Sequence, residues 1–280
     1  MPREVRPGGV TTCHGTDVRL PVRTAVSLPP FTDAATLVAM AVQAERAGWD
    51  GVFLWDHVVF QRRSRLDVHD PWVLLGAVAQ ATERVRLGTL VTPLARRRPW
   101  MVAKHLATLD HLSGGRAVLG VGIGEPSDDD FAAFGEPSDQ RHRAGMLDEA
   151  LTVLDGLLCG AVVHEGEHYR IDSELLPRPV QRPRPPIWVA AVAPHRRPLA
   201  RAVRWDGVVP LAGFEPPTPD RLAGYLAGVE APPGWEVVAT WAPGVPAAEY
   251  SGAGATWLVE GCWPEGDWVA ELRRRIAAGP

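Results

Sequence analysis

The sequence predicts a single (β/α)8 TIM barrel with an insertion after its fourth strand. Three observations lead to this fold class. Strand and helix patterns alternate along most of the 280 residues, the strands are short and almost wholly apolar, and they number eight. Alternation indicates a parallel sheet, because a helical crossover must carry the chain back between parallel neighbours. Eight such strand–helix units favour closure into a barrel, whose usual length is about 250 residues, and short, nearly all-apolar strands are expected when both faces are buried.

The first half of the chain has well-marked element boundaries. Pro30 follows the first apolar run, Asp33 (or the preceding threonine) caps the next helix, and Gly48 closes it. Pro71 stands in the first turn of a second helix, and Pro93 stops the third strand. We expect strands at 23–28, 51–55, 85–91 and 117–121, and helices at 33–48, 70–82 and 99–112.

The second half contains the insertion and four more strands. An amphipathic helix is expected at 140–158, and a hairpin at 162–171 that turns at a Glu-Gly pair. We assign residues 1–280 to one domain, with 1–20 as a flexible N-terminal arm and 126–186 as the insertion. Further strands are expected at 187–191, 207–209, 235–240 and 256–260, and further helices at 195–204, 220–226 and 267–276.

Composition limits the classes of function. The formal net charge of −4 argues against duplex nucleic acid as a partner, because that role needs a basic face. Cys13, Cys159 and Cys262 are too far apart for a zinc or disulfide framework, which fits a reducing compartment. His164 and His168 flank a glycine turn without a third ligand, so we predict no metal site. With neither an apolar leader nor a membrane span in the sequence, a cytoplasmic location is expected.

Polar residues gather where the predicted strands end, which is where TIM barrels place their chemistry. His57 is the strongest candidate, because a histidine can move a proton or bind a cofactor near neutral pH. The alternative is a histidine in a surface loop. Asp56 can help to fix that loop, although neighbouring residues on a strand point to opposite faces. The candidates at strand ends are Asp56, His57, Thr92, Glu125, the turn 191–196 and Glu260.

Glu125 follows a strand end that is rich in glycine. Gly120, Gly122 and Gly124 remove side chains at alternate positions, which allows either the close approach of a planar ligand or a tight barrel corner. A dinucleotide fingerprint fits less well, because the acidic run 128–130 follows and would repel phosphate.

The turn after the fifth barrel strand favours an anion. Its small residues expose backbone N–H groups, and a helix begins near His195 with Arg196 and Arg197 beside it. Bared amides at a helix start attract phosphate. The alternative is that the two arginines only form the solvent-exposed face of the helix.

Several motifs together resemble the bacterial luciferase-like family of flavin-dependent oxidoreductases, the luciferase-like monooxygenases. The resemblance extends from about residue 22 to 213. The matching segments are DGVFLWDH at 50–57, LGTLVTP at 87–93, TLDHLSGGRAVLGVG at 108–122, PPIWVA at 185–190 and WDG at 205–207.

The resemblance implies a (β/α)8 barrel that binds FMN or the deazaflavin coenzyme F420 at its strand C-termini. It implies a non-proline cis peptide behind the flavin ring at Leu90–Val91, with Thr89–Leu90 as the second choice. His57 and Glu125 match the deazaflavin-dependent dehydrogenase branch. Gln61 departs from that branch, which often has an aromatic residue there, and this puts a sugar-phosphate dehydrogenase activity in doubt.

The resulting hypothesis is hydride transfer between this cofactor and a small organic substrate, with His57 and Glu125 as acid and base. A separate flavin reductase and a homodimer remain open as partners, and neither nucleic acid nor a membrane is expected. One alternative is a barrel hydrolase that pairs Glu125 with Glu260. Another is a flavin-binding protein without turnover. The cofactor contacts are assigned to Asp56, Leu90, Val91, Thr92, Ala191, Val192, Ala193 and Arg196.

Overall fold

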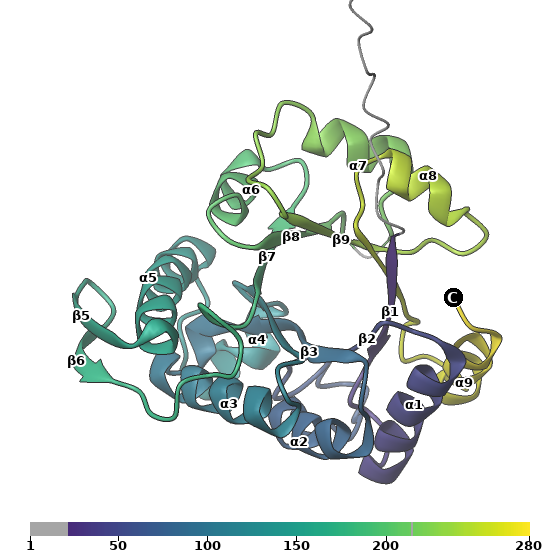
Figure 1. Cartoon of the computed structure of the whole chain (residues 1–280), viewed down its shortest axis with the longest axis horizontal. Helices are drawn as coiled ribbons and strands as arrows, with labels where there is room; N and C mark the ends of the chain where they lie inside the picture. Colours follow the sequence, from purple (N-terminus) through teal and green to yellow (C-terminus); the bar gives the residue numbers. More distant parts are fainter. Residues whose placement is uncertain (1–21, 214) are drawn as a thin grey trace, which may run out of the picture.

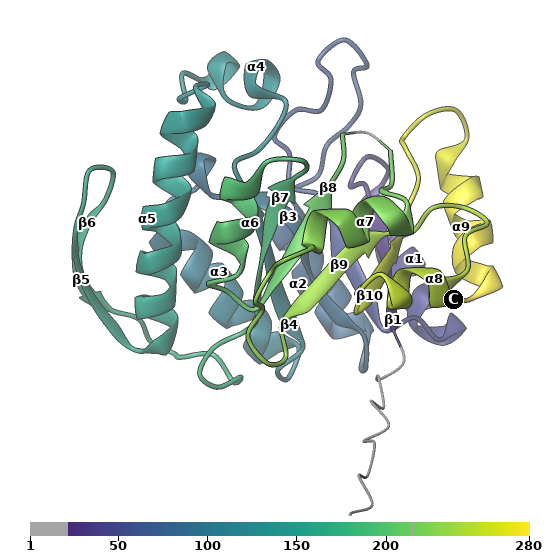
Figure 2. The ribbon, with the colours of Figure 1, turned by 90° about the horizontal axis from the view of Figure 1, so that it is seen from above.

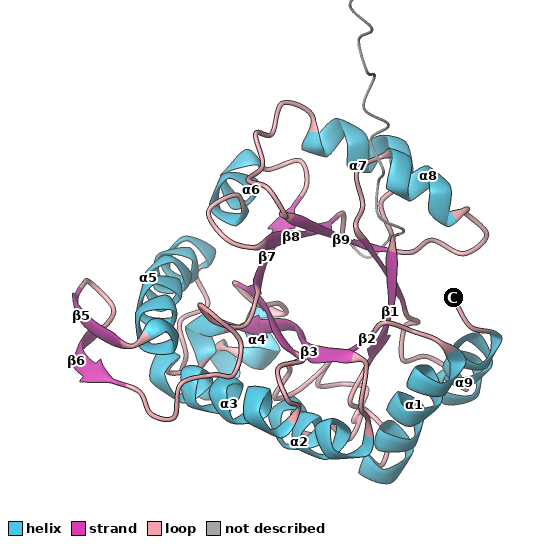
Figure 3. Cartoon of the chain, in the orientation of Figure 1, coloured by secondary structure: helices cyan, strands magenta, loops and turns pink. Residues whose placement is uncertain are grey.

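A computed structural model describes residues 22–213 and 215–280. The arm expected at 1–20 lies outside the described residues. Eight parallel strands form a closed barrel surrounded by helices (Figures 1 and 3), which confirms the predicted fold class. Around the barrel the order is β1-β10-β9-β8-β7-β4-β3-β2, so barrel strands that follow one another along the chain are also neighbours in the sheet.

The barrel strands lie within two residues of the expected bounds. They are apolar because the inner face meets the barrel interior and the outer face meets the helices. They are β1 (Arg23–Leu28), β2 (Gly51–Leu54), β3 (Arg86–Pro93), β4 (Ala117–Gly122), β7 (Ile187–Val192), β8 (Gly207–Leu211), β9 (Glu236–Thr240) and β10 (Trp257–Glu260).

One principal helix follows each strand and covers the outside of the barrel (Figure 1). Local signals begin several of them as expected. The side chain of Asp33 caps α1, Asp70 caps α2 ahead of a first-turn proline, and Gly48 ends α1 in the left-handed conformation. These helices are α1 (Ala34–Ala47), α2 (Pro71–Ala81), α3 (Pro99–Leu112), α5 (Gln140–Cys159), α6 (Arg196–Ala202), α7 (Pro219–Leu226), α8 (Ala247–Gly252) and α9 (Trp268–Ala278).

The region assigned as an insertion is partly regular barrel. Its long helix α5 packs against α3 and is the crossover between β4 and β7. The added elements are short: the helix α4 (Ser127–Asp130), a 3-10 turn after it, and an antiparallel hairpin of β5 (Ala161–Glu165) and β6 (Arg170–Glu174). Neither α4 nor α8 was expected, because four to six residues are too few to show a helical period.

The barrel interior is filled by side chains. Phe53, Trp188 and Trp257 pack together with ring centroids 5.2–6.1 Å apart, inside a cluster to which most strands contribute. Leu90 and Ala190 are only half-buried and pack on this cluster. The interior is therefore a closed plug with an apolar surface, as in other TIM barrels. Among the described residues, no helix is both long and apolar enough to cross a membrane.

Candidate active site

His57 lies just beyond β2, at the carboxyl rim of the barrel. Its Nδ1 is 2.8 Å from Oδ2 of Asp130, a residue at the end of α4. The other carboxylate oxygen of Asp130 accepts hydrogen bonds from the amides of Val58 and Val59, each at 2.9 Å. The Asp130 side chain is 1% exposed and that of His57 is 15% exposed. The buried carboxylate of Asp130 thus fastens the loop after β2 to α4, and Asp129 of the same helix also accepts a hydrogen bond from the Arg62 amide at 2.9 Å.

The environment of Asp130 sets which nitrogen of His57 holds a proton. Burial on its own would raise the pKa of Asp130, but hydrogen bonds from His57 and the Val59 amide, with the nearby charge of Arg96, lower it below its usual range. A carboxylate only accepts hydrogen bonds, so Nδ1 of His57 carries the hydrogen. In the neutral ring, Nε2 is then an acceptor that can take a proton from a substrate.

Asp56, the residue before His57, binds a different set of partners. Its side chain is fully buried, with one oxygen 2.7 Å from Arg97 and 3.3 Å from Arg96. The other oxygen accepts hydrogen bonds from Thr92 at 2.8 Å and from the Trp72 indole at 3.3 Å. Asp56 therefore joins the ends of β2 and β3 from below, and a contribution to cofactor binding would be indirect.

The end of β3 carries the cis peptide that the resemblance implied. It lies between Leu90 and Val91, where the pairing of β3 with β4 also shifts register. A Cβ on Gly120 would come within 2.5 Å of the Thr89 carbonyl oxygen, and one on Gly122 within 3.0 Å of the Val91 side chain. The glycines of β4 thus make room for the bent end of β3. Of the two interpretations, the structure supports the tight corner rather than ligand approach.

The upper surface of the interior plug is an apolar floor at the rim. Leu90, Val91, Ala190 and Leu211 are half-buried and pack on the buried interior cluster. They come from β3, β7 and β8. Such a surface suits one face of a planar ring system, and the proton-handling group His57 follows β2, the neighbour of β3. The residues present therefore fit a flavin-type cofactor.

Glu125 lies in the segment after β4, five residues before Asp130. Its carboxylate is 3.2 Å from Arg143 and accepts hydrogen bonds from Gln140 at 2.9 Å and the Ser127 amide at 3.0 Å. Arg143 is fully buried beneath it. Glu125 is half-exposed but held by these partners, so acid or base chemistry would require it to leave at least one of them.

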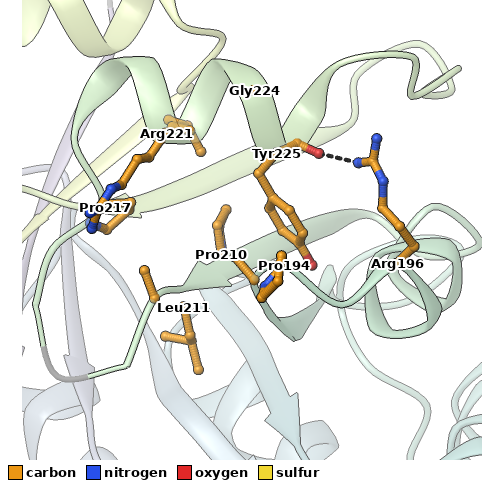
Figure 4. Close-up of a pocket in the computed structure, with 11 residues that line it drawn as sticks. Pro194, Arg196, Pro210, Leu211, Pro217, Arg221, Gly224 and Tyr225 are labelled. Atoms are coloured by element: carbon orange, nitrogen blue, oxygen red, sulfur yellow. Dashed lines mark hydrogen bonds between the residues drawn. The ribbon is translucent and has the colours of Figure 1, made fainter.

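The turn after β7 borders a cavity of about 530 Å³ at the ends of β7 and β8, beneath α7 (Figure 4). The amide of Ala193 is not bare as expected, because it donates to the Leu211 carbonyl at 2.8 Å. The guanidinium of Arg196 donates to the carbonyls of Tyr225 and Ala227. The Ala193 amide is thus paired with the end of β8, and the Arg196 side chain with the end of α7. Figure 4 labels Pro194, Arg196, Pro210, Leu211, Pro217, Arg221, Gly224 and Tyr225 around the cavity.

The two acids of the hydrolase alternative lie on opposite sides of the ring. Glu125 follows β4 and Glu260 ends β10, and these strands are four places apart in a barrel of eight. Glu260 is bound by Arg275 at 2.8 Å, and Glu125 by Arg143. A pair of carboxylates flanking one bond is therefore not formed.

Sequence reasoning missed three parts of this site. Asp130 was interpreted only as part of the acidic run 128–130. Its hydrogen bond to His57 joins residues 73 positions apart, and such a distant contact leaves no local signal in the sequence. Phe60, whose ring is 5.1 Å from that of His57, lies one position before the residue that the resemblance singled out. Arg221 lines the cavity under α7, and an arginine in an amphipathic helix gives no sign of this.

The fold is a closed (β/α)8 barrel, and the His57–Asp130 pair lies beside an apolar surface at the ends of its strands. Together they define a TIM-barrel protein whose carboxyl rim is suited to a bound cofactor. The family model of the luciferase-like monooxygenases matches residues 12–223. The chain belongs to this family, and the resemblance seen in its motifs is confirmed.

Curated relatives carry a more specific name. The chain is 37% identical over 185 residues to an F420-dependent glucose-6-phosphate dehydrogenase of Nakamurella multipartita, covering 64% of this chain and 53% of the relative. The enzyme of the same name from Beutenbergia cavernae is 39% identical over 183 residues, covering 63% and 52%. The chain thus spans about half the length of the curated relatives it matches.

Solved structures confirm the fold. The coenzyme F420-dependent tetrahydromethanopterin reductase of Methanopyrus kandleri superposes with a TM-score of 0.75 at 17% identity, covering 93% of this chain and 99% of that one. The oxygenating component of 3,6-diketocamphane monooxygenase from Pseudomonas putida, in complex with FMN, gives 0.62 at 19% identity, covering 78% and 67%.

Proposed function

We propose that the chain is an oxidoreductase that seats a flavin-type cofactor, coenzyme F420 or FMN, on its carboxyl rim. It moves a hydride between that cofactor and a small organic substrate. The observation that carries this proposal is the His57–Asp130 pair, 2.8 Å apart, next to the half-buried apolar floor at the end of β3. The family and the named relatives support the same chemistry.

The cofactor ring would rest on Leu90 and Val91, with Ala190 on the far side of the floor. Asp56 and Thr92 would act from below, by holding the ends of β2 and β3 together. The phosphate end would lie at the turn formed by Ala191, Val192 and Ala193. The Ala193 and His195 amides are already hydrogen-bonded, so support for this placement comes only from the first turn of α6, which no side chain caps. Arg196 would border the phosphate while its guanidinium holds α7.

Protons would pass through His57. Asp130 fixes the hydrogen on Nδ1 and leaves Nε2 to accept a hydroxyl proton from the substrate or to return it. Glu125 would be a second acid or base, released from its partners when substrate binds. When bound, the cofactor supplies the two-electron chemistry, and the protein supplies orientation and the proton path.

Coenzyme F420 is favoured over FMN because the two curated relatives described above, at 37% and 39% identity, are named for it. An FMN-dependent enzyme would add a separate flavin reductase as a partner. A homodimer and a cytoplasmic location complete the proposal. Cys159 and Cys262 are both outside disulfides, which supports a reducing compartment.

The test is a titration of the purified protein with F420 and with FMN, followed by quenching of cofactor fluorescence. We expect micromolar binding of at least one, and binding of neither would defeat the proposal. His57→Ala should reduce kcat by about 100-fold while changing the cofactor Kd less than about threefold. Equal losses in both would remove His57 from the proton path. Tight binding without oxidation of any donor would indicate a carrier or sensor.

A further inference from the structure

A second cavity, which we call the lower mouth, lies at the other end of the barrel, where the strands begin (Figure 2 shows the barrel from the side). Its volume is about 190 Å³. Its lining includes the first residues of β1, β3, β9 and β10, which are Arg23, Arg86, Glu236 and Trp257. One water occupies about 30 Å³ of the liquid, so the lower mouth has room for a small ion with a few waters.

The inner wall of the lower mouth is the interior plug itself. Val118, Trp188 and Trp257 line the mouth, belong to the buried interior cluster and are at most 1% exposed. The half-buried apolar floor of the rim packs on the same cluster. The plug therefore separates the two ends of the barrel, and a ligand of the lower mouth would be distinct from the cofactor.

Both acids that line the lower mouth are already ion-paired. Glu236 binds Arg23 through one carboxylate oxygen, and its other oxygen accepts a 2.8 Å hydrogen bond from the Trp188 indole. Asp206 is paired with Arg184. A cation would have to displace one of these partners, so the acids do not make a cation site.

The donors of the lower mouth are less fully used. Within residues 22–213 and 215–280, Arg86 forms no ion pair, and the one hydrogen bond of its side chain goes to the neutral amide oxygen of Gln181 at 3.0 Å. The buried indole N–H of Trp257 has no acceptor in the same part of the chain. A guanidinium carries five N–H donors, so most of those on Arg86 are left over. An unpaired positive charge with spare donors favours an oxyanion.

The two arginines are held in place before any ligand binds. The amide nitrogen of Gln181 donates to the buried carboxylate of Asp110 at 2.7 Å, which turns the amide oxygen toward Arg86. The guanidinium of Arg23 lies over the ring of Trp257, 4.5 Å from its centroid. Because these side chains are already ordered, binding costs less conformational entropy than it would at a mobile surface arginine.

We propose that the lower mouth binds a small oxyanion, a phosphate or a small carboxylate, between Arg86 and Arg23. Arg86 supplies the unpaired charge, and the Trp257 indole supplies a further N–H donor. The bound ion connects the beginnings of β1, β3 and β10, and it stabilises the barrel because only the folded chain brings these residues together. This site does not depend on the cofactor or on hydride chemistry at the rim.

The first experiment is a calorimetric titration of the full chain with sodium phosphate and, separately, with sodium succinate, at an ionic strength kept constant with sodium chloride. We expect a Kd of about 1 mM or below for at least one of the two anions. Arg86→Gln should weaken that binding about fivefold, and Arg86→Lys, which keeps the charge, should restore part of it.

The matched control is Arg46→Gln, which removes the same charge from an exposed position on α1 and should bind like the wild type. Circular dichroism of each variant confirms that it is folded. Binding of neither anion by the wild type would overturn the proposal, and so would equal weakening in Arg86→Gln and Arg46→Gln.

The second experiment locates the ion, because phosphate could also bind at the rim. Crystals are soaked with arsenate if phosphate binds, or with bromosuccinate if succinate binds, since arsenic and bromine both give an anomalous signal. We expect a peak between Arg86 and Arg23 that is absent from crystals of Arg86→Gln. A peak found only beneath α7, or one that persists at the lower mouth in Arg86→Gln, would contradict the proposed site.

Discussion

The rim of the barrel is built in two different ways. Above β2 and β3, charged side chains are buried and paired with one another: Asp56 with Arg96 and Arg97, and Asp130 with His57. Above β7 and β8, the rim is a cavity of about 530 Å³ lined largely by small and apolar residues. The guanidinium of Arg196 donates its hydrogen bonds there to backbone carbonyls. The first region fixes the position of a reacting group, whereas the second leaves room for part of a ligand.

The largest expected effect concerns the buried charges of the first region. Asp56→Ala removes the fully buried partner of Arg96 and Arg97 and leaves them only Asp130 at 3.7 Å and the half-exposed Asp70 at 3.2 Å, so it should lower the free energy of unfolding by about 3 kcal/mol. Urea denaturation followed by circular dichroism measures it. Arg221→Ala, in the second region, should change stability by less than about 0.5 kcal/mol. Equal losses would mean that the two regions do not differ as described.

Asp130→Asn tests how His57 is held. An amide can donate as well as accept, so it no longer fixes the hydrogen on Nδ1, and kcat should fall by about 100-fold. The cofactor Kd should change little, because Asp130 lies behind His57. Asp128→Asn makes the same change on an exposed residue of the same short helix and should leave kcat near the wild-type value. A normal kcat for Asp130→Asn would show that its bond to His57 is only structural.

In the second region, we expect Arg221 to contribute mainly to ligand binding and Arg196 mainly to the stability of the fold. Arg221 lines the cavity and forms no ion pair among the described residues, so Arg221→Ala should weaken binding of inorganic phosphate or cofactor by about 2–5-fold. Arg196→Ala removes donors from the Tyr225 and Ala227 carbonyls and should cost about 1 kcal/mol of unfolding free energy. Calorimetric titration and urea denaturation of both variants measure the two effects, and a reversal of the roles would contradict the assignment.

The smallest expected effect is a dependence of stability on acid pH. The pKa of Asp130 is lowered, so this carboxylate stabilises the fold above its ordinary value of 3.8 and loses that contribution as pH falls toward the folded value. Unfolding free energy measured from pH 5 downward should fall less steeply in Asp130→Asn than in the wild type. Parallel curves would show that Asp130 titrates alike in the folded and unfolded chain.

Local sequence signals predicted the barrel well because they act over short distances. Caps such as Asp33, the first-turn Pro71 and the left-handed Gly48 mark helix ends within one turn. The rim depends on contacts that no such signal records. Asp130 reaches His57 only when α4 folds back over β2, and the Arg196 side chain is redirected by the carbonyls of α7.

The end of β3 shows one feature that the sequence predicted and one that it left undecided. The cis peptide at Leu90–Val91 was placed correctly from the resemblance. The glycines of β4 were left between two meanings, since a bare backbone serves a ligand or a neighbouring strand equally well. Only the position of Val91 against Gly122 decided between them.

The central claim is that the apolar floor and His57 together hold a flavin-type ring, and a crystal structure with bound F420 or FMN tests it most directly. The account predicts the ring in van der Waals contact with Leu90 and Val91, with Nε2 of His57 turned toward it. A ring bound instead wholly beneath α7, or at the opposite mouth of the barrel, would contradict it.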